Sequence, residues 1–188
     1  MQMAYIGMGG NLPSWAGAPE ATLAAAAQRL ESLGHVAARS SLYSTEPVGF
    51  TEQPRFVNAV LALETKLEPQ QLLEGLLALE LEFGRNRLSG FTNGPRTLDL
   101  DILLFGDRTV NEPDLQIPHP RLVQRAFVLI PLAEIAPDIV VPGSGETAAR
   151  LVASHVSKAR HGVRGPKGGS SADSDTVVRL QSDRWSTG

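Results

Sequence analysis

The chain carries at residues 94–105 the segment GPRTLDLDILLF, in which two aspartates interrupt an otherwise apolar run. This composition predicts a β-strand, and side chains two residues apart on a strand share a face. Asp99 and Asp101 therefore point to one side, whereas Leu98, Leu100 and Ile102 point into the core on the other. We expect the paired carboxylates to mark a functional surface of the molecule.

Two strand residues span about 6.6 Å at roughly 3.3 Å per residue, a separation that two divalent ions about 3.5 to 4 Å apart can bridge. Aspartate is a poor strand former and like charges repel, so the pair favours a cationic ligand. A bare Asp-x-Asp pair also fits an ordinary amphipathic strand whose polar face is in water. The functional interpretation is favoured by five cationic or ionisable side chains nearby in the sequence, namely Arg85, Arg87, Arg96, His119 and Arg125.

The rest of the chain predicts alternating strands and helices. Hydrophobic periodicity indicates strands at residues 3–8, 36–43 and 56–64, and helices at 20–33, 68–83, 127–135 and 147–155. In chain order, the first five of these elements (3–8 to 68–83) and the aspartate strand that follows them give the order β-α-β-β-α-β. This order predicts an α+β fold, a ferredoxin-like antiparallel sheet with helices packed on one face.

Length and composition indicate one domain, which we assign to residues 1–156, followed by a basic tail at 157–188. The chain has 188 residues, 42% of them hydrophobic, and no cysteine, which excludes disulfides and thiolate metal sites. The tail carries six Lys or Arg against three Asp and a long Gly/Ser-rich run, so it has almost nothing to bury. We predict that it is disordered and that truncation after Val156 leaves turnover intact.

Charge and hydropathy limit the partners. A formal net charge of -3 argues against broad nucleic-acid binding, and no stretch is long and apolar enough for a membrane span. The first residues lack the basic region of a secretory signal, so we expect a cytoplasmic protein. We also expect it to act as a monomer. The arginines between residues 85 and 125 suggest a compact anionic ligand, because the planar guanidinium suits phosphate oxygens.

The segment at 94–103 resembles the signature of the 6-hydroxymethyl-7,8-dihydropterin pyrophosphokinase family. The similarity covers roughly residues 3–140 and includes YIGMGGNL (5–12), YSTEP (43–47), FVNA (56–59), ELEFGRNR (80–87), IPHPR (117–121) and RAF (125–127). The resemblance implies transfer of pyrophosphate from ATP to the hydroxymethyl group of the pterin, with release of AMP, in folate biosynthesis. It also implies that the partners are these two small molecules.

The resemblance further implies roles for individual residues. Asp99 and Asp101 match the positions that hold two Mg²⁺ ions, and Arg85 and Arg96 match catalytic arginines that act on the phosphates. The positions implied for ATP binding are Glu80, Arg87, Ile102, His119 and Arg125. Those implied for the pterin are Thr45, Glu46, Val48, Phe56, Asn58 and Phe127, with the two phenylalanines stacking on the ring and the Asn58 amide pairing with its edge.

Two positions depart from the family pattern. Asn93 stands where relatives often have a tryptophan, and Gly10 stands where relatives have a serine. Two other functions remain open from the sequence. A nucleotidyltransferase built on the same two aspartates would release pyrophosphate instead of AMP, and a non-catalytic nucleotide-binding domain would release neither.

Overall fold

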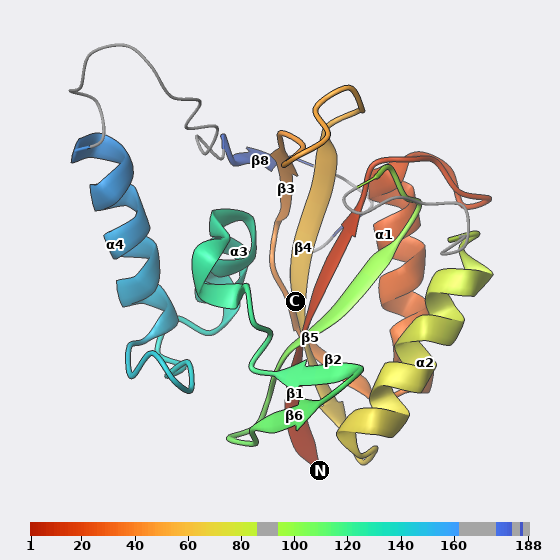
Figure 1. Ribbon diagram of the computed structural model, residues 1–188. Helices are drawn as coiled ribbons and strands as arrows, with labels where there is room; N and C mark the ends of the chain where they lie inside the picture. Colours follow the sequence, from red (N-terminus) through yellow and green to blue (C-terminus); the bar gives the residue numbers. More distant parts are fainter. Residues whose placement is uncertain (86–93, 162–175, 182–184, 186–188) are drawn as a thin grey trace.

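The computed structural model of the chain describes residues 1–85, 94–161, 176–181 and 185 (Figure 1). Within them, one sheet contains six strands, which are β1 (Gln2–Gly10), β2 (His35–Arg39), β3 (Leu42–Thr45), β4 (Phe56–Thr65), β5 (Asp99–Phe105) and β8 (Val178–Leu180). The helices are α1 (Pro19–Arg29), α2 (Pro69–Glu82), α3 (Ala126–Ile135) and α4 (Ala148–His161). A separate hairpin joins β6 (Val110–Glu112) to β7 (Leu115–Ile117), and two 3₁₀ turns lie at Leu30–Ser32 and Leu122–Gln124. The predicted α+β class with an antiparallel sheet is confirmed.

The strand register builds the centre of the sheet. The order is β5-β1-β4-β3-β8, with β2 also paired to β4, and β1 runs antiparallel to both of its neighbours. Gly9 of β1 lies opposite Asn58 of β4 and opposite Asp99 of β5, so these two side chains stand on one face with a glycine between them. A Cβ at Gly9 would lie 2.9 Å from the Asn58 amide oxygen, so only glycine leaves room for that amide.

Helices cover both faces of the sheet, whereas the sequence predicts helices on one face. Figure 1 shows α1 and α2 on one side and α3 and α4 on the other. Leu61 of β4 packs in the core cluster that includes α1 and α2, and the next residue back, Val60, packs in the cluster that includes α3 and α4. The prediction therefore holds for α1 and α2 only, because alternate residues of β4 are apolar on both faces.

Four local predictions differ from the structure. The single strand expected at residues 36–43 is divided into β2 and β3 by Ser40 and Ser41, and the Ser40 hydroxyl accepts a hydrogen bond from Val60 N at 2.9 Å. A side chain that takes the place of a ladder partner interrupts regular pairing. The β6–β7 hairpin is absent from the prediction, α4 continues to His161 beyond the expected domain end at 156, and β8 forms within the expected tail.

The C-terminal region departs from the predicted disorder at two places. Val178–Leu180 pair with β3 as β8, and Trp185 is buried in the main core cluster. A buried indole and an added strand give this region more to bury than its Gly/Ser content suggests. Residues 162–175 lie outside the described residues, and their predicted disorder stays a prediction. No helix in the described ranges is long and apolar enough to cross a membrane.

Candidate active site

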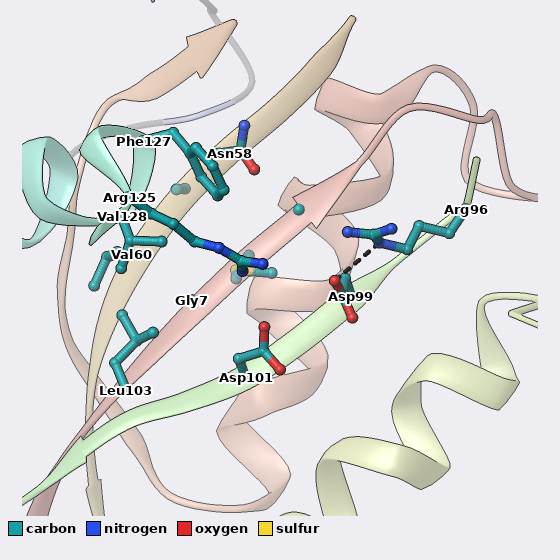
Figure 2. A pocket seen from close by; sticks show the side chains of 13 residues that line it. Gly7, Asn58, Val60, Arg96, Asp99, Asp101, Leu103, Arg125, Phe127 and Val128 are labelled. Atoms are coloured by element: carbon teal, nitrogen blue, oxygen red, sulfur yellow. Dashed lines mark ion pairs between the residues drawn. The ribbon is translucent and has the colours of Figure 1, made fainter. Parts of the chain in front are cut away.

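The two aspartates of β5 share one face of the sheet, as predicted, and this is the face that carries α3 and α4 (Figure 2). Asp99 forms ion pairs with Arg85 Nη1 and with Arg96 Nε, the latter at 2.8 Å. Asp101 is 44% exposed on its side chain. Partial burial of the carboxyl, followed by repulsion from Asp99 and Glu80, raises the pKa of Asp101 to about 6. One carboxylate is therefore neutralised by arginines, and the other lacks full compensation.

Arg85 follows the C-terminal end of α2, which places its side chain beside Asp99. The helix ends before Gly84, whose φ of +83° favours glycine, and Arg85 N donates to the Glu80 carbonyl at 3.0 Å. The Glu80 carboxylate is 1% exposed and accepts a hydrogen bond from Leu100 N at 2.8 Å, besides pairing with Arg85. Burial opposes the charged guanidinium, but Asp99 and Glu80 outweigh it and raise the pKa of Arg85. Glu80 thus ties α2 to β5 and holds the arginine in place.

Asn11, which the sequence reasoning missed as a site residue, anchors the segment that carries Arg96. Its side-chain oxygen accepts from Arg96 N at 2.9 Å, and its own backbone N–H donates to Arg96 O at 2.9 Å. Its amide nitrogen donates to Pro54 O at 2.9 Å and to Gln53 Oε1 at 3.0 Å. A Cβ at the preceding Gly10 would lie 2.3 Å from Thr97 O, so the glycine permits this close approach. The signal in the sequence was the Gly-Gly-Asn turn after a strand.

His119 approaches Asp101 from the segment before α3. Its Nε2 lies 4.0 Å from Asp101 Oδ2, and its Nδ1 accepts a hydrogen bond from Arg121 N at 3.1 Å. Burial, followed by repulsion from Arg125 and Arg121, lowers the pKa of His119 to about 4. The ring is therefore neutral at pH 7, and because Nδ1 is an acceptor, the proton is on Nε2 and faces Asp101. Burial and Arg121 also lower the pKa of Arg125, against the opposing effect of Asp101 and Asp99.

A small cavity of about 40 Å³ lies above the two β1 glycines, Gly7 and Gly9. Figure 2 shows the Arg125 side chain extending from the α3 side across the sheet face, between Phe127 and Asp101. Its guanidinium carbon is 5.4 Å from the centre of the Phe127 ring, within cation–π range. A space of this size holds one or a few waters and no bicyclic ring, which needs a pocket of hundreds of Å³. Arg125 therefore occupies space that a ring-shaped ligand would need.

A second cavity of about 510 Å³ lies on the other side of Asp101. Asp101 lines both cavities, so the carboxylate stands at their common wall. Of the residues that line it, the sequence reasoning missed several, among them Gln70, Leu73 and Leu77 of α2 and Leu115 and Gln116 of β7. The α2 residues follow a helical spacing of three and four, which was a visible signal, but the same spacing is expected of a face that packs on the sheet.

The structure brings together eight of the predicted site residues around these cavities. Asn58, Arg96, Asp99, Asp101, Arg125 and Phe127 line the smaller one, and Asp101, Ile102 and His119 line the larger one. Arg85 joins them through Asp99. In the described part of the chain, five predicted residues besides Arg85 are not among those lining either cavity, namely Thr45, Glu46, Val48, Phe56 and Glu80. Arg87 and Asn93 lie outside the described residues.

Two of these five are linked to the smaller cavity through other side chains. Thr45 Oγ1 accepts a hydrogen bond from Asn58 Nδ2 at 2.8 Å, and the Phe56 ring has the Arg96 guanidinium carbon 4.8 Å from its centre. Glu46 is paired with Arg55 in the loop after β3, and Val48 of the same loop is exposed. Thr45, Phe56 and Asn58 therefore lie on β3 and β4 beside the smaller cavity, whereas Glu46 and Val48 are not linked to it by these contacts.

The described residues contain no group of three or more His, Cys, Asp or Glu side chains arranged to hold a metal ion. The metal-binding candidate is the Asp99–Asp101 pair that the family resemblance implies. Mg²⁺ suits such a pair, because it is commonly held by one or two carboxylates and takes its other ligands from water and phosphate oxygens. The incomplete compensation of Asp101, whose pKa is raised to about 6, is consistent with a site for an added cation.

Comparison with known proteins identifies similar sequences. A family model described as 7,8-dihydro-6-hydroxymethylpterin-pyrophosphokinase matches residues 5–137. A curated 2-amino-4-hydroxy-6-hydroxymethyldihydropteridine pyrophosphokinase from Pseudomonas aeruginosa is 46% identical over 144 residues, which cover 76% of this chain and 85% of the relative. The protein of the same name from Haemophilus influenzae is 44% identical over 146 residues, covering 77% and 88%.

Among solved structures, the fold is similar to that of a Plasmodium falciparum protein described as HPPK-DHPS wild type with pteroate. The TM-score is 0.69 at 16% identity, and the match covers 85% of this chain and 45% of the Plasmodium protein. The chain thus spans less than half of that protein's length. At this identity the likeness concerns the fold alone.

Proposed function

This chain belongs to the 7,8-dihydro-6-hydroxymethylpterin-pyrophosphokinase family, and we propose that it transfers pyrophosphate from ATP to the hydroxymethyl group of 6-hydroxymethyl-7,8-dihydropterin in folate synthesis. The observation that carries the proposal is the position of Asp101 at the common wall of the two cavities. A pterin in the smaller cavity and a nucleotide in the larger one would meet at this carboxylate.

The larger cavity suits ATP in size and chemistry. Its volume of about 510 Å³ is in the range of small-molecule sites. Leucines of α2 and β7 supply apolar walls for a planar base, and Gln70 and Gln116 supply amides that both donate and accept hydrogen bonds. His119, neutral and with Nε2–H toward Asp101, would donate to a phosphate oxygen. Ile102 adds to the apolar wall, whereas Glu80 acts through Arg85 instead of touching the nucleotide.

The smaller cavity suits the pterin only after Arg125 moves away. Phe127 provides one flat apolar face, and the Asn58 amide, oriented by Thr45, provides a donor and an acceptor for the ring edge. Arg125 and Arg96 lie against Phe127 and Phe56 in the ligand-free protein. Phosphates are stronger partners for guanidinium groups than ring faces, so bound ATP would draw the arginines toward its charge and free both rings.

Asp99 and Asp101 would hold the magnesium, and we propose two ions. When bound, Mg²⁺ would neutralise charge on the phosphates and activate the attacking oxygen. Arg85 and Arg96, which pair with Asp99 in this structure, are placed to exchange that carboxylate for phosphate oxygens. As permanently charged groups they would stabilise the charge that develops on the transferred pyrophosphoryl group.

The reaction forms a bond between the hydroxymethyl oxygen and the β-phosphorus, and it breaks the bond from that phosphorus to the oxygen that leaves with AMP. The hydroxyl proton is released to solvent. Among the described residues, His119 is no base for the hydroxyl proton, because its Nδ1 accepts from Arg121 N and its Nε2 carries a proton. Orientation of the two substrates and charge stabilisation would therefore supply most of the rate enhancement.

Product analysis tests this function against its alternatives. The protein is incubated with ATP, Mg²⁺ and 6-hydroxymethyl-7,8-dihydropterin, and the nucleotide products are separated. AMP together with the pterin diphosphate supports the proposal. Release of pyrophosphate would identify a nucleotidyltransferase, and unchanged ATP would identify a non-catalytic nucleotide-binding domain. We also propose that the enzyme acts as a cytoplasmic monomer, to be tested by sedimentation and by cell fractionation.

A further inference from the structure

The C-terminal segment that follows the family match lies against the sheet edge beside the proposed pterin site. We use the name C-terminal strap for residues 176–181 together with Trp185. The family model matches residues 5–137 only, so the strap is outside it. β8 pairs antiparallel with β3, with Tyr43 opposite Arg179 and Ser44 opposite Val178. The strap therefore extends the sheet at the strand that carries Thr45.

Trp185 anchors the strap. Its side chain is 6% exposed and belongs to the main core cluster. Its indole N–H donates to Ser40 O at 2.6 Å, and the Arg39 guanidinium carbon is 5.8 Å from the centre of the ring. Ser40 lies in the break between β2 and β3. A buried indole with a satisfied N–H is an anchor of the kind that dominates packing energies at interfaces.

Arg179 connects the strap to α3, the helix that carries Phe127. The Glu134 carboxylate of α3 accepts from Arg179 Nη2 at 3.1 Å. The same carboxylate accepts from Ser41 N at 2.8 Å, from Ser41 Oγ at 2.7 Å and from Tyr43 OH at 3.0 Å. Charge-assisted hydrogen bonds of this kind are stronger than neutral ones. One carboxylate thus joins α3, β3 and the strap.

The strap also contacts the loop after β3. Arg55 Nη2 donates to Thr176 O at 3.2 Å, while its Nε donates to Ser44 Oγ at 2.9 Å. The same guanidinium pairs with Glu46. Arg55 directly precedes Phe56, and Glu46 directly follows Thr45. Through Arg55, the strap is therefore linked to both ends of the loop between β3 and β4, which the family resemblance assigns to pterin binding.

We propose that the C-terminal strap is a positioning element for the pterin side of the active site, acting through Glu134 on α3 and through β3 on Thr45 and Asn58. The inference rests on the proposed function. Substrate-positioning groups need not touch the substrate, because small displacements of the residues that do can reduce the rate severely. The described strap residues line neither cavity, but their contacts lead to α3 and, through Thr45, to Asn58 of β4, and these two elements line the smaller cavity and not the nucleotide cavity. The strap should therefore affect the pterin and spare ATP.

Full-length variants with steady-state kinetics test the inference. In Trp185→Ala we expect the KM for the pterin to rise about tenfold, and in Arg179→Ala about threefold, with the KM for ATP within about twofold of wild type in both. Arg150→Ala removes an equally charged, exposed arginine from α4 and serves as the matched control, with both KM values unchanged. Trp185→Phe keeps the aromatic ring but loses the hydrogen bond to Ser40 O, so we expect partial rescue relative to alanine.

Three outcomes would overturn the inference. These are a folded Trp185→Ala protein with an unchanged pterin KM, a parallel rise of both KM values with loss of melting temperature, and an Arg179→Ala protein that matches Arg150→Ala. If Trp185→Ala does not fold, Trp185→Phe and Arg179→Ala decide by the same comparison.

A measurement that needs no catalysis separates failure of this inference from failure of the proposed function. The chain has two tryptophans, so Trp15→Phe leaves Trp185 as the only one. We expect the emission maximum of a buried indole in that protein and slow amide exchange at residues 42–45. A solvent-like emission would show that the strap is undocked and would refute the inference. Absence of AMP formation by wild type, with a docked strap, would instead refute the function.

Discussion

Two carboxylates on the same side of the sheet are compensated in different ways. Glu134, at the β3 side, accepts from three groups of β3 and the preceding residues and from Arg179. Asp101 lies in the cleft, by which we mean the two cavities that it separates. Its carboxylate has the neutral His119 4.0 Å away, and its pKa is raised to about 6. The first carboxylate is satisfied by the protein itself, and the second is suited to a ligand that the protein lacks.

The arginines show the same difference. In the cleft, Arg125 lies against the Phe127 ring, and Arg96 lies against the Phe56 ring besides pairing with Asp99. Phosphate oxygens are partners that can replace these ring contacts. At the β3 side, Arg179 and Arg55 bind carboxylates and a carbonyl of the chain. The cleft is therefore arranged for exchange of partners, and the strap region is arranged to stay fixed. The predictions below test that contrast, from the largest effect to the smallest.

Replacing Asp101 by asparagine should have the largest effect on activity. The amide keeps the size of the side chain but removes the charge that would hold Mg²⁺, and we expect turnover to fall at least ~10²-fold. The thermal stabilisation by Mg²⁺ and ATP should also weaken. Asp107→Asn, in an exposed turn after β5, is the control and should stay within about twofold of wild type. Near-normal turnover of Asp101→Asn at saturating Mg²⁺ would remove the chemical basis of the proposed metal site.

Phe127→Ala should weaken pterin binding and leave ATP binding almost unchanged. The variant removes one flat wall of the smaller cavity, at a cost of about 1 to 3 kcal/mol in pterin affinity, the scale of one stacked aromatic. Calorimetric titration with each substrate measures both affinities. Equal losses for the two substrates, or unfolding with no selective loss, would make Phe127 a core residue instead.

Glu134→Gln should lower the free energy of unfolding and leave kcat almost unchanged. The amide keeps the shape but loses the charge that holds Arg179 and the Ser41 and Tyr43 donors, at an expected cost of about 1 to 3 kcal/mol of unfolding free energy. Urea unfolding gives the free energy, and kcat at saturating substrates should stay within about twofold of wild type. A large fall in kcat without loss of stability would contradict the contrast between a strap region that stays fixed and a cleft whose side chains exchange partners.

The pH dependence of the metal-free protein should give the smallest effect, because the Asp101 side chain is 44% exposed and solvent screens its interactions. The pKa of Asp101 is about 6 in the folded protein against an ordinary value of 3.8, so folding favours the protonated form. That contribution to stability is complete below pH 4 and is lost as the pH rises through 6. The melting temperature of metal-free wild type should therefore fall relative to Asp101→Asn between pH 4 and 6. Melting curves without metal measure this difference, and a difference that does not change with pH would show that Asp101 is fully compensated.

Much of the cleft could be predicted from local sequence. Alternation along the strand is enough to put Asp99 and Asp101 on one face, because the period of two is a property of the backbone. The presence of helices on both faces also left a signal, since β4 is apolar and buried along nearly its whole length. The Gly-Gly-Asn turn that contains Asn11 is also typical of an ordinary turn, and the spacing of the α2 residues is also expected of a helix face that packs on the sheet. The sequence could therefore not separate a role in the site from a structural role.

The strap could not be predicted, because its contacts are long-range. The hydrogen bond from Trp185 to Ser40 joins residues 145 positions apart, and β8 has three residues, too few to show a period. Composition suggested only that the region has little to bury, which led to the expectation that truncation after Val156 is harmless. The buried indole reverses that expectation, since deleting residues 157–188 would remove Trp185 from the core and β8 from β3.

The pairing of β8 with β3 also has a consequence for the behaviour of the protein in solution. Without β8, the outer edge of β3 would offer unpaired backbone N–H and C=O groups beside mostly buried side chains. Such an edge is a template for the strand of another molecule. We therefore expect variants that release the strap to self-associate as concentration rises, and light scattering on a concentration series would detect this. By occupying that edge with its own chain, the protein would limit such association.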